Sequence, residues 1–239
     1  MRLFWTALRF LTVFPWPKSL KSTPEEIGRS ASFFPLVGFC LGLLLALFAR
    51  LLHPYLDSTF LGITLVTLMI LLTRAFHLDG LGDTFDGLGA GGGPQEALRA
   101  MDDSRIGVFG LVAIVIVLAF KFHALAVLGD WRGLLLAPVL GRWAMVVLAY
   151  GSKAAHAGLG QMMVENMRGR HLFVATLLTL ILVLLFSPRI GLWIALWVSL
   201  LTHLGRNYLH RRLGGVTGDT FGAVGELSET LALVVFASV

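Results

Sequence analysis

The chain contains seven long runs of apolar residues separated by shorter polar stretches. We place the runs at about residues 33–52, 58–76, 106–128, 133–150, 172–187, 190–206 and 219–239. The runs are continuous rather than alternating, and among spanning structures this favours helices over closed barrels. The pattern therefore predicts an all-α, polytopic integral membrane bundle of six or seven spanning helices. The last run is the least regular, because Glu226 and Glu229 interrupt it.

Composition supports a membrane protein over a soluble one. Of 239 residues, 56% are hydrophobic and 14% are charged, whereas soluble domains have about 25% charged residues. No linker or internal repeat divides the runs, so we treat residues 1–239 as a single domain embedded in the lipid bilayer. The one cysteine, Cys40, lies inside an apolar run, which excludes a disulfide framework.

Basic residues are distributed unevenly between the two sides of the predicted bundle. Five lie before the first run and three lie in each of the second, fourth and sixth loops, against only Arg50, Arg132 and Arg189 on the opposite side. Cytoplasmic loops carry the excess of Lys and Arg, so we predict a cytoplasmic N-terminus in a bacterial inner membrane. Of the 14 acidic residues, only Asp57 and Asp130 lie on the outer side. The net charge of +5 reflects topology, and no nucleic-acid partner is expected.

The end of the second run carries a group of acidic residues. Residues 76–87 read Phe-His-Leu-Asp-Gly-Leu-Gly-Asp-Thr-Phe-Asp-Gly and place Asp79, Asp83 and Asp86 at spacings of four and three. These spacings put the carboxylates on one helix face, where they repel one another unless a cation binds. Mg²⁺ prefers oxygen ligands and commonly combines one or two carboxylates with substrate phosphate. We therefore expect a Mg²⁺ site facing the cytoplasm, with His77 and Asp86 as candidates for proton transfer.

Two further features follow in the same loop. Residues 87–93 contain five glycines, which indicate either a simple hinge or a lid whose backbone amides approach phosphate. Asp103 precedes Arg105, and a guanidinium can grip phosphate through two N–H groups. We assign Asp103 to the metal site and Arg105 to the catalytic group, with a solvated charged turn as the alternative.

Two cationic residues interrupt the spanning runs. Lys121 and Arg142 lie inside the third and fourth runs, where a charge is costly and usually faces a partner or a wet cavity. We predict that both bind the substrate or cofactor. The alternative is that their side chains extend to the membrane surface.

A glycine-rich segment precedes the last run. Gly214, Gly215 and Thr217 are candidates for close backbone approach to a ligand, and Asp219, with the two glutamates of this run, repeats the acidic pattern at spacings of seven and three. Two acidic faces could hold two Mg²⁺ ions around a pyrophosphate. We therefore predict Asp219, Glu226 and Glu229 as further metal ligands, with a capped glycine turn as the alternative.

Several motifs in order resemble the cobalamin synthase family of adenosylcobinamide-GDP ribazoletransferases. They are Phe10–Pro17, Phe33–Gly38, Phe76–Gly87, Asp103–Gly107, Leu213–Asp219 and Gly222–Glu229. The resemblance covers nearly the whole chain. Asp102 departs from it, since the family more often has a basic residue there.

The resemblance implies a late step of cobalamin synthesis with Mg²⁺ as cofactor. A family member joins adenosylcobinamide-GDP to α-ribazole or its 5′-phosphate and releases GMP. The residues alone imply magnesium, phosphate and a cytoplasm-facing site, and only the resemblance supplies the corrinoid. A homo-oligomer is compatible with the sequence.

Two other functions remain open from the residues. A CDP-alcohol phosphotransferase also uses a spaced Asp series, but Asp83 and Thr84 stand where its motif has Ala and Arg. A divalent-cation transporter would spread acidic residues to the outer side, where only Asp57 and Asp130 lie.

Overall fold

A computed structural model describes residues 1–14 and 22–239, and the described chain is helical throughout, without any β-strand. The predicted all-α fold is therefore confirmed. Pro15, Trp16 and Pro17, which end the first resemblance motif, lie outside the described residues. So do Lys18 and Lys21, two of the basic residues counted before the first run.

Five helical stretches of the described chain are long and apolar enough to cross a membrane. The first, Pro24–Leu52, comprises α2 (Pro24–Ser30), a short 3₁₀ turn and α3 (Phe34–Leu52). The others are α7 (Val108–Val127), α8 (Arg132–Ala149), α10 (Gly169–Phe186) and α12 (Gly218–Ala237). Each begins and ends within three residues of a predicted run, except that the first stretch starts earlier. The last run, whose glutamates made it uncertain, is therefore among the candidate spans.

The second predicted run forms a broken helix instead of a straight one. α4 (Ser58–Thr73) and α5 (Phe76–Gly89) meet at a bend of 88° and become a sixth candidate span if counted together. Arg74 and Ala75 lie between them in the left-handed region, with φ of 56° and 55°. The sequence predicted the acidic residues at a helix end, whereas they occupy a separate helix after the bend.

The sixth predicted run, 190–206, lies inside α11 (Pro188–Leu213), which is the longest described helix. α11 is long enough for a span, but polar residues in its C-terminal half lower its hydropathy. It is not among the candidate spans. Five or six candidate spans are therefore found where six or seven were predicted.

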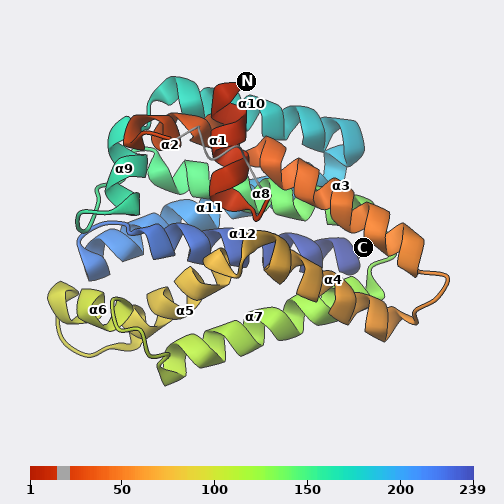
Figure 1. The fold of residues 1–239 in the computed structure, drawn as a ribbon, viewed down its shortest axis with the longest axis horizontal. Helices are drawn as coiled ribbons and strands as arrows, with labels where there is room; N and C mark the ends of the chain where they lie inside the picture. Colours follow the sequence, from red (N-terminus) through yellow and green to blue (C-terminus); the bar gives the residue numbers. More distant parts are fainter. Residues whose placement is uncertain (15–21) are drawn as a thin grey trace.

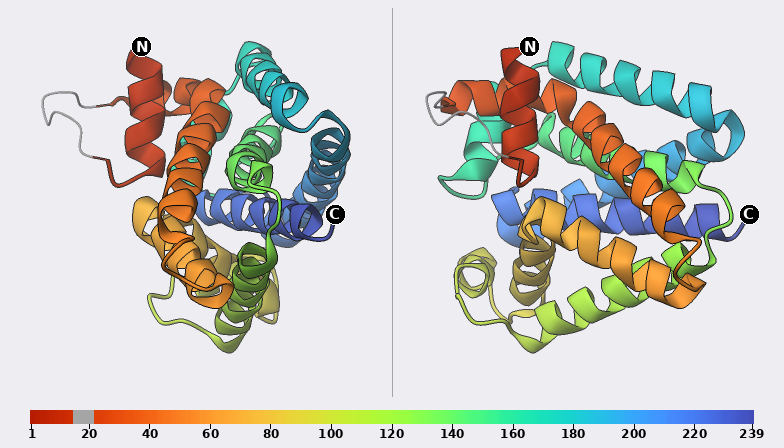
Figure 2. Two further views of the ribbon diagram at one scale, coloured as in Figure 1. Left: turned by 90° about the vertical axis from the view of Figure 1, so that its right-hand side faces the viewer. Right: turned by 45° about the vertical axis from the view of Figure 1, so that its right-hand side comes forward.

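The core of the bundle is α8. All of its residues from Gly133 to Ala149 are buried, and it packs against α3, α10, α11 and α12 (Figures 1 and 2). α1 (Arg2–Leu11) crosses the other helices instead of running along them (Figure 1). α1 is not a candidate span, and it packs across α2 and α3 through buried Ala7 and Leu11.

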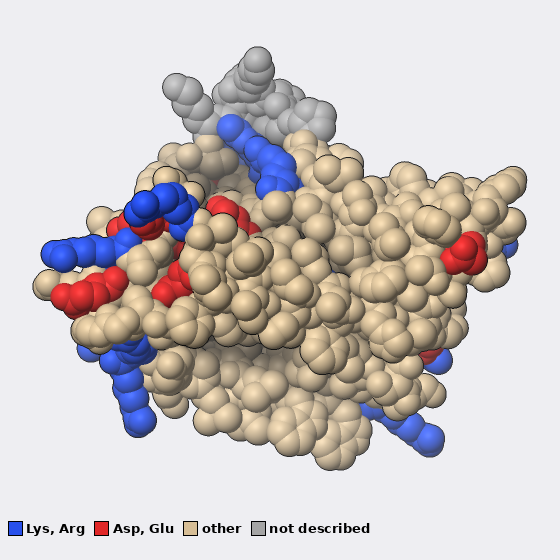
Figure 3. All heavy atoms as spheres, turned by 90° about the horizontal axis from the view of Figure 1, so that it is seen from below, with Lys and Arg blue, Asp and Glu red and all other residues tan. Residues whose placement is uncertain are grey.

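Two short helices lie at one end of the molecule. They are α6 (Pro94–Met101) and α9 (Leu159–Asn166), at the left in Figure 1. Figure 3 shows most of the visible acidic and basic side chains over this same end. The charged end and the apolar body are therefore distinct, as expected for a protein whose polar end lies outside the bilayer.

Candidate functional site

The crossing of α5 and α12 brings acidic residues from both helices together. A Cβ added to Gly80 would lie 2.8 Å from the Cα of Asp219, and one added to Gly222 would lie 2.9 Å from the carbonyl oxygen of His77. The two backbones are therefore in contact at glycines. This contact places Asp219, in the first turn of α12, beside the acidic face of α5.

The acidic group formed by Asp79, Asp83 and Asp219 has no compensating Lys or Arg partner among residues 1–14 and 22–239. Asp83 is repelled by Asp79 and Asp219, and also by Asp86 and Asp102. Among the described residues, no ion pair joins Asp79, Asp83 or Asp219 to a Lys or Arg. The like-charge repulsion predicted from the spacing is therefore present in the fold.

An open cleft of about 350 Å³ lies beside this group. Asp79 and Asp83 form one wall, and the loop from Asp102 to Ile106 forms another. Asp79 is exposed and Asp83 is half-buried, so a ligand in the cleft could reach both carboxylates. The cleft thus combines acidic groups with the cationic side chain of Arg105.

Arg105 and Asp103 form a two-point ion pair at the rim of the cleft. The Nε and Nη2 groups of Arg105 donate to Oδ1 and Oδ2 of Asp103 at 3.1 and 2.8 Å. This pairing lowers the pKa of Asp103 to about 2. Because the side chain of Arg105 is 87% exposed, it can exchange Asp103 for a phosphate without losing buried contacts.

Asp86 has a structural role that the sequence did not predict. Its carboxylate accepts hydrogen bonds from the backbone N–H groups of Gly107 and Gly110, at 2.7 and 2.8 Å, at the start of α7. A Cβ on either glycine would overlap this carboxylate. A carboxylate is favourable at a helix N-terminus, so Asp86 ties α5 to α7. Its predicted metal-binding and catalytic roles stay predictions.

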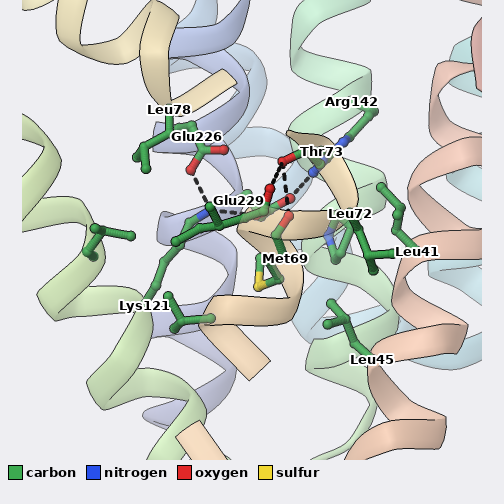
Figure 4. Close-up of a pocket in the computed structure, with 14 residues that line it drawn as sticks. Leu41, Leu45, Met69, Leu72, Thr73, Leu78, Lys121, Arg142, Glu226 and Glu229 are labelled. Atoms are coloured by element: carbon green, nitrogen blue, oxygen red, sulfur yellow. Dashed lines mark hydrogen bonds and ion pairs between the residues drawn. The ribbon is translucent and has the colours of Figure 1, made fainter. Parts of the chain in front are cut away.

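Four charged residues predicted for ligand binding instead pair with one another inside the bundle. Lys121 on α7 donates to Glu226 at 2.6 Å and to Glu229 at 2.5 Å, and Arg142 on α8 pairs with the other oxygen of Glu229. Figure 4 shows the four side chains converging from three helices among Leu and Met side chains. We call these four residues the buried quartet.

The sequence predicted that the two glutamates of the buried quartet bind metal and that its two cations bind the substrate or cofactor. In the structure the glutamates and the cations contact one another. Two positive and two negative charges cancel, so Glu226 and Glu229 need no metal ion for neutrality. The adjoining cavity is only about 20 Å³, enough for roughly one water molecule. These contacts separate Lys121 and Arg142 from the acidic cleft, and the predicted ligand-binding roles of the four residues stay predictions.

His77 also lies away from the open cleft. Its side chain is 2% exposed, and its Nε2 atom has no hydrogen-bond partner among the described residues. Electrostatic interactions link it to Glu226, Lys121 and Arg142 of the buried quartet. Its predicted role in proton transfer stays a prediction, and its burial disfavours direct contact with a substrate in the cleft.

The glycine-rich segment before α12 is explained by local packing. Gly214 ends α11 with φ of 79°, and a Cβ on Gly215 would overlap the backbone of Lys153–Ala155. Thr217 is buried and caps α12 by accepting a hydrogen bond from the Thr220 N–H. These contacts match the alternative of a capped turn, and they do not test the predicted ligand contacts.

Two residues near the site were not singled out from the sequence. Arg212, at the end of α11, donates to the carbonyl oxygens of Ala90 and Gly92 and so anchors the glycine-rich loop. His156 is exposed and close enough to Asp219 to interact with it electrostatically. Arg212 lies just before the glycine-rich segment in sequence, but its contacts with Ala90 and Gly92, like the place of His156, are revealed only by the tertiary fold.

The donor chemistry of the acidic group suits Mg²⁺. Among the described residues, no group of three or more His, Cys, Asp or Glu side chains surrounds a single metal position. Mg²⁺ commonly takes only one or two carboxylates and completes its shell with water and substrate phosphate. Asp79, Asp83 and Asp219 supply such oxygens without competing cations, so the residues fit this ion.

Comparison with known proteins assigns the chain to a family. The family described as cobalamin-5-phosphate synthase matches residues 3–237. The chain belongs to this family. The chain is similar to the adenosylcobinamide-GDP ribazoletransferases of Geotalea daltonii, 42% identical over 100% of this chain and 98% of the relative, and of Syntrophobacter fumaroxidans, 44% identical over 96% of both chains. The enzyme of that name from a Thermoanaerobacter species is 34% identical over 98% of this chain and 96% of the relative. No solved structure matches the chain.

Membership of the cobalamin-5-phosphate synthase family confirms the resemblance seen in the sequence. The chain is therefore an enzyme of cobalamin synthesis, which excludes the phosphotransferase of CDP-alcohols and the cation transporter as its family. Three of the resemblance motifs meet at the acidic group. Phe76–Gly87 lies in α5, Asp103–Gly107 forms the cleft rim, and Leu213–Asp219 leads into α12.

Proposed function

We propose that this cobalamin synthase joins adenosylcobinamide-GDP to α-ribazole or its 5′-phosphate, with Mg²⁺ as cofactor, and releases GMP. The proposal takes the substrates from the names of the relatives. The observation that carries the site is the acidic group of Asp79, Asp83 and Asp219, which opens onto a cleft and has no cation partner in the described chain.

The proposed reaction is a substitution at phosphorus. The 3′-hydroxyl oxygen of the ribazole forms a bond to the cobinamide-side phosphorus of the diphosphate. The bond between that phosphorus and the bridging oxygen breaks, and GMP leaves with the bridging oxygen. The hydroxyl proton passes to a base, for which a cleft carboxylate that does not hold the metal is better placed than buried His77.

The residues of the cleft bind and orient the diphosphate in this proposal. Asp79, Asp83 and Asp219 would hold Mg²⁺, which when bound neutralises charge on the diphosphate. Arg105 would exchange its pairing with Asp103 for a phosphate oxygen. Asp86 shapes the cleft by holding the start of α7. Catalysis of phosphoryl transfer depends mostly on such positioning and charge stabilisation.

The membrane setting is part of the same proposal. The candidate spans are apolar, and the charged end holds the cleft. With the predicted positive-inside orientation, this end faces the cytoplasm, where nucleotide substrates are available. The corrinoid and the ribazole would then approach from the same side of the inner membrane.

A substitution of Asp83 tests the proposal. Asp83→Asn keeps the side-chain shape but removes one charge, so we expect GMP release to fall at least about 100-fold because metal-assisted charge stabilisation is lost. The assay uses purified protein, Mg²⁺, adenosylcobinamide-GDP and the ribazole substrate. Membrane insertion and elution as a single species should be unchanged.

The matched control is Glu165→Gln. Glu165 is an exposed carboxylate of α9 that contacts only Gln161 by hydrogen bond among the described residues. It should retain near-normal turnover. Near-normal turnover of Asp83→Asn would contradict the assignment of the metal site, and no GMP release by the unaltered protein would contradict the proposed reaction.

A further inference from the structure

The pair formed by α10 and α11 presents an apolar surface on one side of the bundle. The two helices are consecutive in the chain and pack against each other (Figure 2). Their outward side chains are apolar and exposed, and include Phe173, Leu177 and Leu184 on α10 and Trp193, Trp197 and Leu204 on α11. An exposed apolar surface of this kind is typical of contact with a membrane.

The exposed side of α11 changes from apolar to basic along the helix. Arg189 and Arg206 enclose its apolar half, and they are about 26 Å apart along the helix axis at about 1.5 Å per residue. The hydrocarbon core of a bilayer is about 30 Å thick. With the apolar half in the bilayer, Arg206 lies at the depth of the lipid headgroups. It belongs to the charged end of the molecule, because the end of α11 packs against α6.

Arg206 is held in place by the chain that leaves α8. Its Nη1 group donates to the carbonyl oxygen of Tyr150 at 2.9 Å. The next residue, Gly151, has φ of 76°, and a Cβ there would lie 3.4 Å from the same Nη1 atom. The Nε and Nη2 groups of Arg206 have no hydrogen-bond partner among residues 1–14 and 22–239. A planar guanidinium with free N–H groups suits the oxygens of a phosphate.

Other polar groups lie beside Arg206. The backbone N–H of Lys153 lies 3.4 Å from Nε2 of His210. Burial lowers the pKa of His210, and the positive charges of Arg206 and Lys153 lower it further. Tyr150 is exposed, and its hydroxyl group has no partner within the described ranges. We call Tyr150, Lys153, Arg206 and His210 the basic junction, because they join the end of α8 to α11.

The positive charge of the basic junction is not balanced by the protein. Between Gly151 and Gly218 the chain contains a single acidic residue, Glu165, and its carboxylate bonds to Gln161 at 2.7 Å. Where the chain is described, no Asp or Glu forms an ion pair with Lys153 or Arg206. The basic junction therefore suits an anionic partner.

We infer that the basic junction binds the headgroup of an anionic phospholipid, whose acyl chains lie on the apolar surface of α10 and α11. The inference rests on the membrane setting of the proposed function and not on the reaction. Basic pockets between helices on the cytoplasmic side are typical sites for anionic headgroups. A soluble phosphate would use the cations but not the adjoining apolar surface. A second copy of the chain, related by a twofold axis, would bring like charges together.

The binding of single lipids to the full-length protein tests this inference. The protein is purified in a nonionic detergent, and its affinities for phosphatidylglycerol and phosphatidylcholine are measured by native mass spectrometry. The unaltered protein should bind phosphatidylglycerol about fivefold or more tightly than phosphatidylcholine. Arg206→Gln should weaken phosphatidylglycerol about fivefold and phosphatidylcholine by less than about twofold, because one cation beside a headgroup contributes about that factor. Arg206→Lys, which keeps the charge, should retain most of the preference.

Two further variants separate lipid binding from folding and from charge in general. Lys153→Gln removes an exposed cation whose side chain has no partner in the described ranges, so the fold should persist while phosphatidylglycerol binds more weakly. Arg189→Gln, at the opposite end of the same helix, is the matched control and should leave both affinities unchanged. No preference in the unaltered protein, or equal weakening by Arg189→Gln and Arg206→Gln, would overturn the inference.

The same spectra test the other occupants. Inorganic phosphate at millimolar concentration should not displace phosphatidylglycerol, since it lacks acyl chains. Displacement by phosphate would assign the basic junction to a soluble anion instead. A dimer that depends on Arg206, without any preference for phosphatidylglycerol, would assign the surface to a second copy of the chain. Because no GMP is measured, these outcomes are separate from a failure of the proposed reaction.

Discussion

The charged residues of this cobalamin synthase are neutralised in two different ways. In the buried quartet, Lys121 and Arg142 offset Glu226 and Glu229 through direct contacts. In the acidic group at the cleft, no Lys or Arg of the described chain forms an ion pair with the carboxylates. The first arrangement is complete by itself, whereas the Mg²⁺ that we propose would complete the second. This difference separates structural charge from the proposed catalytic charge.

The quartet predicts a specific stability effect at the scale of single residues. Lys121→Met removes one cation and leaves Glu226 as an unpaired buried carboxylate, so we expect a loss of about 3–5 kcal/mol in unfolding free energy. Unfolding in mild detergent by a graded denaturant measures this. The double variant Lys121→Met/Glu226→Gln removes one charge of each sign and should recover much of the loss. A double variant no more stable than the single one would show that charge pairing is not the cause.

Sequence reasoning identified the charged residues but not their partners. Lys121 and Arg142 stood out because charges in apolar runs are rare, and the two glutamates stood out for the same reason. Their pairing depends on the packing of α7, α8 and α12. Lys121 and Glu226, for example, are 105 residues apart in the sequence. No spacing rule within one helix could supply that contact, so residues of one network were assigned to separate tasks.

Close packing at glycines is the main determinant of the site at the scale of helices. α5 and α12 touch through Gly80 and Gly222, and each glycine faces backbone atoms of the other helix. Backbone cannot move aside as the end of a flexible side chain can. The distance between Asp83 and Asp219 therefore depends on Gly80 and Gly222 having no Cβ atom.

A single methyl group at this crossing should impair the enzyme. Gly222→Ala would place a Cβ 2.9 Å from the His77 carbonyl oxygen, so α5 and α12 must separate. We expect GMP release to fall about tenfold or more, since displacement by about 1 Å can cost 100-fold in rate. Gly205→Ala in α11, where a Cβ meets nothing within 4 Å, is the control and should leave turnover unchanged. Equal activity of the two variants would contradict the role of the crossing.

The helices themselves were largely predictable, and the bend between α4 and α5 was not. Long apolar runs fixed α3, α7, α8 and α10 to within a few residues. The bend lies at Arg74 and Ala75, and neither residue is a glycine or proline that would indicate a left-handed turn from the sequence. Contacts from the end of α1 stabilise that turn, and such long-range contacts are invisible to local patterns.

The charged residues of the molecule are concentrated at one end, and the other end carries few (Figure 3). The cleft and the glycine-rich loop both belong to the charged end. The count of Lys and Arg in the loops predicted this asymmetry from sequence. It also predicts that the charged end faces the cytoplasm, which remains to be tested by labelling.

Cysteine labelling in intact cells tests the orientation. The chain has one cysteine, half-buried Cys40, so Cys40→Ala provides a background without thiols. In that background, Tyr55→Cys lies in the exposed α3–α4 loop and Ala157→Cys lies in the exposed loop before α9. We expect a membrane-impermeant maleimide to label position 55 from outside and position 157 only after permeabilisation, as the positive-inside rule requires. The reverse pattern would contradict the orientation.

The dependence of the acidic group on α12 has a consequence for how the protein is made. Asp79 and Asp83 emerge from the ribosome well before Asp219, which belongs to α12. Until that helix arrives, the glycine face of α5 has no partner and Lys121 has no carboxylate to pair with. On the proposed mechanism, catalytic competence therefore comes only after α12 has been made, and a nascent chain that stops before α12 remains inert however many helices it has inserted.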